Sequence, residues 1–117
     1  TEIGVLELGN NLKIAFIPGE IEPDIVGGGN TLKKEYAFAK EDFSEGTLKD
    51  ALEYEDLTVF GLTNDACGYI IPDNDFSMMF LGSNKFMRKI FGDHYLEIFS
   101  FGKETASTIV KAFKELK

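Results

Sequence analysis

Two polar side chains stand at the ends of apolar segments of this chain, and both are of types that bind metal ions or polarise a substrate. Glu20 follows the apolar run and turn Ala15-Phe16-Ile17-Pro18-Gly19, and Tyr69 lies in the segment Cys67 to Pro72. Residues at the carboxyl ends of strands in α/β sheets commonly face the ligand crevice. Each residue also has a purely structural interpretation, as a charged residue at a turn or as part of a strand that ends in a loop.

Other kinds of catalytic site find little support in the sequence. His94 is the single histidine and Cys67 the single cysteine, and no nucleophile elbow surrounds any serine. A zinc site made wholly by this chain would need three or four ligands, which one His, one Cys and scattered carboxylates do not supply. We therefore expect His94 to be a structural or surface imidazole. The three glycines from Gly27 to Gly29 are not followed by Lys-Ser or Lys-Thr, so they predict a flexible connector rather than a phosphate-binding loop.

The first part of the chain has the pattern of a β-hairpin and a short helical turn. Residues Ile3 to Leu8 and Leu12 to Ile17 form two apolar runs, and Gly9-Asn10-Asn11 supplies turn residues between them. Pro23 can open a helical turn that the following glycines end. We expect the second strand to stop at the Pro-Gly pair, which places Glu20 at a strand end.

The second part of the chain predicts two strands and two helices. Thr47 with Asp50 resembles a capping box for a short helix, residues Leu57 to Leu62 predict a central strand, and residues 66–71 predict a weaker extended segment. Residues 76–91 are densely apolar without clean periodicity, which favours core filling and leaves open a groove for an acyl chain. The last helix is amphipathic, with apolar residues at Ala106, Ile109, Val110, Phe113 and Leu116. Together these segments predict an α/β fold with a mixed β-sheet and flanking helices, which starts with a β-hairpin and ends in an amphipathic C-terminal helix.

The composition favours a single acidic globular domain over residues 1–117. The chain has 44% hydrophobic residues and a formal net charge of −8. Such a charge repels nucleic acids at long range, so no nucleic-acid partner is expected. No apolar stretch reaches the roughly 18 residues needed to span a bilayer, so no transmembrane segment is expected. Because the chain starts at Thr1, almost inside a strand, we expect it to be a portion of a longer polypeptide.

The chain carries its candidate motifs in a characteristic order. Ala15 to Glu20 ends in Pro-Gly-Glu, and Val59 to Asn64 ends in Gly-Leu-Thr-Asn ahead of Tyr69. His94 to Glu97, Phe101 to Thr105 and the final helix follow. This order resembles the neutral, or alkaline non-lysosomal, ceramidase family of zinc-dependent amidases, which split the amide of N-acyl sphingoid bases. The resemblance spans nearly the whole chain, although each motif alone is short.

The resemblance implies an activity, a cofactor and roles for two residues. It implies the C-terminal part of the catalytic domain of a zinc-dependent amidohydrolase, with a lipid-like amide of sphingolipid metabolism as substrate. It assigns a zinc-ligand role to Glu20, and to Tyr69 the role of a zinc ligand or a catalytic donor to the oxyanion. The family's two histidine ligands lie upstream of this sequence, so the missing N-terminal portion of the same polypeptide is the expected partner and the chain alone is expected to be inactive. A secreted or cell-surface location is implied by the resemblance alone.

Two departures from the family pattern leave an alternative open. Family members often carry a tyrosine three residues before the one matching Tyr69, where this chain has Ala66, and if that tyrosine is the ligand this chain has lost it. The segment after Glu20 is Ile21-Glu22-Pro23 rather than the usual Phe-Thr-Thr. These departures favour a non-catalytic binding or accessory protein that kept the scaffold and lost the metal. An acidic structural domain with coincidental motifs is a third interpretation.

Overall fold

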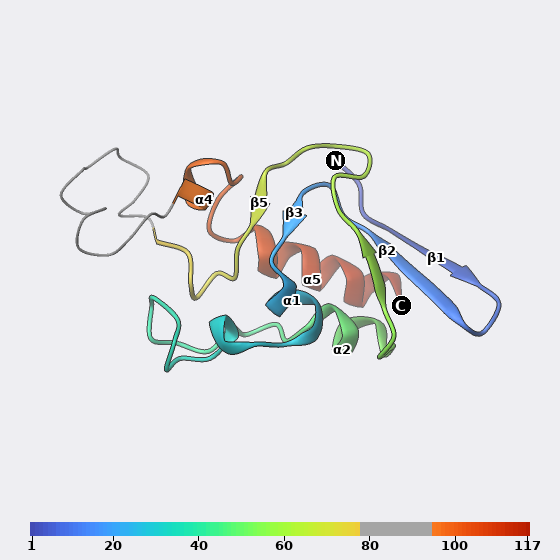
Figure 1. Ribbon diagram of the computed structural model, residues 1–117, viewed down its shortest axis with the longest axis horizontal. Helices are drawn as coiled ribbons and strands as arrows, with labels where there is room; N and C mark the ends of the chain where they lie inside the picture. Colours follow the sequence, from blue (N-terminus) through green and yellow to red (C-terminus); the bar gives the residue numbers. More distant parts are fainter. Residues whose placement is uncertain (78–94) are drawn as a thin grey trace.

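The computed structural model describes residues 1–77 and 95–117, which form short strands covered by helices (Figure 1). The predicted α/β class, the mixed sheet, the initial hairpin and the final helix are all confirmed. In chain order the elements are β1 (Gly4–Leu8), β2 (Leu12–Phe16), β3 (Glu20–Ile21), α1 (Pro23–Gly27), the 3₁₀ turn η1 (Asn30–Leu32), α2 (Leu48–Leu52), β4 (Thr58–Phe60), β5 (Tyr69–Ile70), α4 (Tyr95–Ile98) and α5 (Thr105–Leu116).

The larger sheet is built on the hairpin. β1 and β2 pair antiparallel, from Gly4 opposite Phe16 to Leu8 opposite Leu12. β4 adds to the other side of β2 in parallel, which gives the order β1-β2-β4. The prediction of a central strand over residues 57–62 is therefore wrong within the described part of the chain, where β2 is central and β4 lies at the end of the order. An apolar run indicates burial but does not identify the neighbours of a strand.

The same two chain segments pair a second time beyond a bend. β3 follows β2 after Pro18-Gly19, β5 follows β4 after the loop of residues 61–68, and the two form a separate parallel pair. Pro18 has no backbone N–H to donate to a strand ladder, which explains why β2 does not run on into β3. The carboxyl ends of β2 and β4 thus lead directly to the segments that hold Glu20 and Tyr69.

The helices cover one side of the strands and enclose the core. α2 packs against α5, α1 packs against α2, and Figure 1 shows α5 running behind β3 and the larger sheet. The apolar face of α5 is buried as its spacing predicts, except that Leu116 is 54% exposed. The core cluster joins this face to the strands and to α2, and it includes Ala15, Ile17, Ile25, Leu48, Leu52, Ile70, Ile109, Val110 and Phe113.

The predicted helix ends are also present. α1 begins at Pro23 and is followed by Gly28, whose φ of 91° is the left-handed region that glycine tolerates. α2 begins with the predicted capping box, in which the Thr47 hydroxyl accepts a hydrogen bond from the Asp50 amide at 3.0 Å. The Asp50 carboxylate accepts one from the Thr47 amide at 3.1 Å in return.

Part of the sequence prediction falls outside the described residues. His94 and all but the start of the apolar stretch at residues 76–91 belong to that part. Phe76, at its start, is 3% exposed. Among the helices that the structure does describe, none has the length and apolar character needed to cross a membrane.

Candidate functional site

The parallel pairing of β3 and β5 brings the two predicted site residues together. Glu20 and Tyr69 are directly opposite one another in the register of this pair, although 48 intervening residues separate them in the chain. Side chains in register on neighbouring parallel strands project to the same face, from backbones about 4.8 Å apart. Glu20 is exposed and Tyr69 is partly buried. The sequence alone placed Glu20 at the end of one strand and Tyr69 within a later extended segment. The structure instead makes each of them the first residue of a short strand, and these two strands are neighbours.

Backbone hydrogen bonds fix this pair on both sides. The Glu20 amide donates to the Gly68 carbonyl at 2.8 Å, and the Glu22 amide donates to the Ile70 carbonyl at 3.1 Å. The Tyr69 amide donates in the other direction, to the Phe99 carbonyl just after α4, at 2.9 Å. β5 therefore lies between β3 and the segment after α4, and both candidate residues have their backbone amides held.

The loop before β5 wraps around the Pro-Gly turn. The Cys67 amide donates to the Pro18 carbonyl at 2.6 Å, and the Thr63 hydroxyl donates to the Ile17 carbonyl at 3.1 Å. Asn64 adopts a left-handed backbone with φ 68° within this loop, a conformation that asparagine tolerates better than most residues. Ala66 is exposed, so the position at which the family often has a tyrosine lies on the surface of the same loop.

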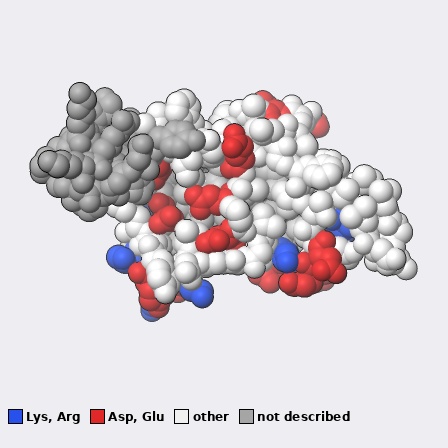
Figure 2. All heavy atoms as spheres, in the orientation of Figure 1, with Lys and Arg blue, Asp and Glu red and all other residues white. Residues whose placement is uncertain are grey.

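Next to the pair lies a group of four carboxylates that the sequence analysis did not single out. Burial is the largest cause, and together with the neighbouring charges of Asp75, Asp24 and Glu97, in that order, it raises the pKa of Glu22 to about 7. Glu97 of α4 is 3% exposed, and its carboxylate accepts a hydrogen bond from the Ser77 amide at 3.4 Å. Figure 2 shows acidic side chains gathered over β3 and α1, and among the described residues no Lys or Arg is seen between them. The only sequence signal for this group was the alternation of acids at Glu20, Glu22 and Asp24.

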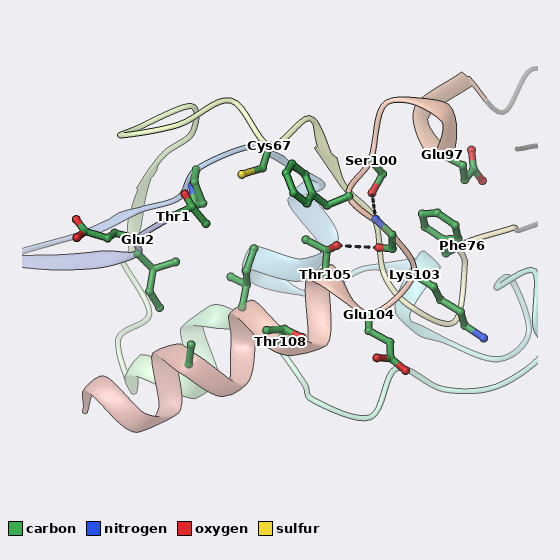
Figure 3. Close-up of a pocket in the computed structure, with 16 residues that line it drawn as sticks. Thr1, Glu2, Cys67, Phe76, Glu97, Ser100, Lys103, Glu104, Thr105 and Thr108 are labelled. Atoms are coloured by element: carbon green, nitrogen blue, oxygen red, sulfur yellow. Dashed lines mark hydrogen bonds between the residues drawn. The ribbon is translucent and has the colours of Figure 1, made fainter.

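A groove of about 940 Å³ adjoins the same segments (Figure 3). It shares Pro18 and Cys67 with the turns that lead to β3 and β5, and its lining continues along the first turns of α5. The volume is within the range of about 300–1,000 Å³ that is typical of ligand pockets. Figure 3 shows Thr105 and Thr108 of α5, Cys67, Ser100 and Thr1 around it. Its apolar lining includes Ile3, Phe76, Phe101, Ile109 and Ala112.

The donors of this site fit part of a zinc coordination shell. Glu20 offers a carboxylate oxygen and Tyr69 a phenolic oxygen, and both can bind Zn²⁺ as oxygen ligands. Within residues 1–77 and 95–117 no group of three or more His, Cys, Asp or Glu side chains is arranged to hold a metal ion. Structural and catalytic zinc sites use three or four protein ligands, of which Glu20 and Tyr69 would supply two. His94, the single histidine, lies outside the described residues.

Comparison of the chain with protein-family models, with curated proteins and with solved structures gives no match. A function is therefore inferred from the geometry of this site and from the resemblance of the sequence motifs to those of the neutral ceramidases.

Proposed function

We propose that this chain is the C-terminal part of the catalytic domain of a zinc-dependent amidohydrolase similar to the neutral ceramidases. The observation that supports it best is the register of β3 and β5, which sets Glu20 directly opposite Tyr69. The resemblance assigned metal-site roles to these two residues from motifs that lie far apart in sequence. A fold that left them on separate surfaces would have argued against those roles.

The chain's own residues would bind the metal and orient the amide. Glu20 would be an anionic ligand, and Tyr69 would be a second ligand or would donate its phenol proton in a hydrogen bond to the carbonyl oxygen as negative charge develops there. Zinc, when bound, would activate a water molecule and polarise the amide carbonyl. The hydrogen bonds that hold the Glu20 and Tyr69 amides would keep both side chains in one geometry through the reaction.

The apolar part of the substrate would lie in the groove. A lipid-like amide has a polar reacting centre and long hydrocarbon chains, and a site for it needs an apolar channel that starts at the reacting residues. The lining of the groove includes Pro18 and Cys67, which directly precede Gly19-Glu20 and Gly68-Tyr69 in the chain.

The remaining ligands would come from the N-terminal portion of the same polypeptide. Large apolar side chains are exposed on the described surface, and they support the proposal of such a partner because apolar surface is favourably buried against another unit. Leu62 is 52% exposed and Phe101 is 77% exposed, on the two loops that flank β5.

The second candidate function is a binding or accessory protein on the same scaffold. Ala66 favours it, because a methyl group at this position cannot serve as a ligand if the family's metal-binding tyrosine belongs there. In that case the groove would hold a lipid-like molecule without cleaving it.

Metal content and activity of the intact polypeptide distinguish the two candidates. We would measure bound zinc and the hydrolysis of an N-acyl sphingosine for the wild type and for Glu20→Ala and Tyr69→Phe. Matched controls are Glu115→Ala and Tyr36→Phe, at exposed positions outside the site. The amidase proposal predicts stoichiometric zinc and turnover in the wild type and both controls, loss of zinc in Glu20→Ala, and loss of turnover in both site variants. A folded wild type without zinc and without turnover would refute the amidase proposal and, of these two candidates, would leave the binding protein.

A further inference from the structure

Three glycines around the candidate site share one arrangement. These glycines are Gly19, Gly61 and Gly68. The amide of the residue that follows each glycine donates a hydrogen bond to a backbone carbonyl, and the glycine itself lies against that same carbonyl. The Leu62 amide donates to the Gly19 carbonyl at 3.1 Å, and the Glu20 amide donates to the Gly68 carbonyl at 2.8 Å. The Tyr69 amide donates to the Phe99 carbonyl at 2.9 Å. Two of these three donors, Glu20 and Tyr69, are the candidate site residues.

The first two contacts leave no room for a side chain. A Cβ on Gly61 would lie 2.8 Å from the Gly19 carbonyl oxygen. A Cβ on Gly19 would lie 2.6 Å from the Gly68 carbonyl oxygen and 2.9 Å from Cδ1 of Ile70. Because the two carbonyls belong to the backbone directly before β3 and β5, the chain could not accommodate a methyl group without moving these backbone segments apart.

The third contact is the tightest and has a second requirement. A Cβ on Gly68 would overlap the Phe99 carbonyl oxygen, and Gly68 has a φ of 74°, a conformation that side chains disfavour. Gly68 also forms an isolated antiparallel bridge with Ser100. This glycine joins β5 to the segment after α4, just as Gly19 joins β3 to β5.

The contacts form a continuous series from β4 to α4 that passes through both candidate residues. Gly61 rests on Gly19, Gly19 on Gly68, and Gly68 on Phe99. A displacement at any of these steps shifts the backbone amide of Glu20 or Tyr69, or the strand that carries it. Gly4 and Gly27 lack this constraint: a Cβ on Gly4 would approach only the Phe16 side chain, at 3.8 Å, and one on Gly27 only the flexible Lys49 side chain, at 3.6 Å.

We propose that Gly19, Gly61 and Gly68 are positioning residues, which set the spacing of Glu20 and Tyr69 through close backbone packing and thereby set the affinity of the metal site. The inference rests on the proposed function for the metal, but the effect on the spacing of the pair does not. Ligand positioning of this kind typically changes metal affinity by roughly 10- to 100-fold.

Two measurements on the intact polypeptide separate these parts. The first is amide hydrogen exchange at Glu20 and Tyr69, with Ala51 of α2 and Val110 of α5 as references in the core. The second is the dissociation constant for Zn²⁺, together with the visible spectrum of the Co²⁺ form, which reports ligand geometry in the folded fraction. The variants are Gly19→Ala, Gly61→Ala and Gly68→Ala, with Gly4→Ala and Gly27→Ala as controls. Gly61→Ala has the mildest overlap of the three and keeps the test decisive if Gly68→Ala does not fold.

The positioning role predicts faster exchange at Glu20 and Tyr69 in the three variants, unchanged exchange at Ala51 and Val110, and zinc binding weakened about 10-fold or more with an altered Co²⁺ spectrum. Gly4→Ala and Gly27→Ala should resemble the wild type. Wild-type exchange and wild-type zinc affinity in Gly19→Ala and Gly61→Ala would overturn the inference. If the exchange changes as expected while the wild type binds no zinc, the spacing role of the glycines stands and the proposed function fails.

Discussion

Replacement of Glu22 by glutamine should stabilise the fold at neutral and alkaline pH. Burial and the charges of Asp75, Asp24 and Glu97 raise the pKa of Glu22 from 4.5 to about 7. A carboxyl whose pKa is higher in the folded state than in the unfolded chain destabilises the fold once it ionises. The wild type should therefore lose stability as the pH rises from about 4.5 to about 7, and the loss should be complete above that range.

The size of the effect follows from the same values. At about 1.4 kcal/mol per pKa unit, the rise from 4.5 to about 7 corresponds to a ceiling of roughly 3 kcal/mol. Glu22 is only partly buried, and solvent screening reduces the expected difference to about 1–2 kcal/mol. Since glutamine has nearly the same shape and no charge, Glu22→Gln should be more stable than the wild type by this amount at pH 8 and equal to it at pH 4.

Urea unfolding at a series of pH values, with a chelator present, would measure this difference directly. Glu115→Gln, at an exposed position near the end of α5, is the control, and its difference from the wild type should not vary with pH in this way. Asp75→Asn keeps the oxygen that accepts the Phe38 amide and removes one of the neighbouring charges, so it should move the wild-type transition to lower pH. Parallel curves for the wild type and Glu22→Gln from pH 4 to pH 8 would refute the reasoning.

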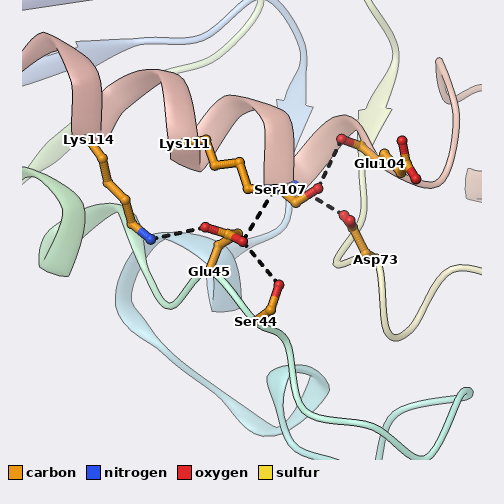
Figure 4. Close-up of polar contacts among 7 residues, drawn as sticks. All are labelled: Ser44, Glu45, Asp73, Glu104, Ser107, Lys111 and Lys114. Carbon is orange, nitrogen blue, oxygen red and sulfur yellow. Dashed lines mark hydrogen bonds and ion pairs between the residues drawn. The ribbon is translucent and has the colours of Figure 1, made fainter.

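Two further predictions concern α5 and its attachment. Phe113 is fully buried in the core cluster, so Phe113→Ala should destabilise the fold by about 3–5 kcal/mol in urea unfolding, whereas Leu116→Ala at the exposed end should cost less than about 1 kcal/mol. Glu45 accepts a hydrogen bond from Lys114 at 3.1 Å and contacts Lys111 at 3.5 Å (Figure 4), and the Lys114 hydrogen bond is the main cause that lowers the pKa of Glu45. Ionised Glu45 therefore stabilises the fold at pH values above the pKa that Glu45 has in the unfolded chain, and this stabilisation is lost as the pH falls. Glu45→Gln should consequently be slightly less stable than the wild type at pH 7, and the difference should disappear in high salt or at pH 3.

Local sequence signals predicted the elements well because their causes are local. The hairpin follows from two apolar runs around Gly9, and the start of α2 follows from Thr47 and Asp50, whose side chains and amides lie within one turn of each other. The buried face of α5 follows from its apolar spacing. In each case the residues that decide the structure are neighbours in the chain.

The strand order and the acidic group were not predictable in the same way. β4 is an edge strand of the described sheet because of where β2 and the hairpin lie, which its own sequence does not encode. Glu22, Asp75 and Glu97 come from three distant segments, and only the packing of α4 and of residues 73–77 near β3 brings their charges together. Glu20 and Tyr69 were named from the motifs, but the fact that they lie opposite one another depends on the β3–β5 register.

Under the proposed function, one contact would explain two features: the larger sheet has exposed apolar side chains on one face, and Glu20 and Tyr69 supply only two of the zinc ligands. The register places Phe16 beside Phe60, and Leu6 beside Ile14, on the face opposite the core cluster, where Leu6 is 40% and Phe60 is 49% exposed. Parallel strands such as β2 and β4 are usually covered on both faces, because both of their faces tend to be apolar. If a polypeptide segment covered this face and reached the carboxyl ends of β2 and β4, it would also lie at the edge that leads to Glu20 and Tyr69. The same segment could then bury the open face and bring the missing ligands to the pair, so that the stability of the sheet and the assembly of the metal site would depend on one contact.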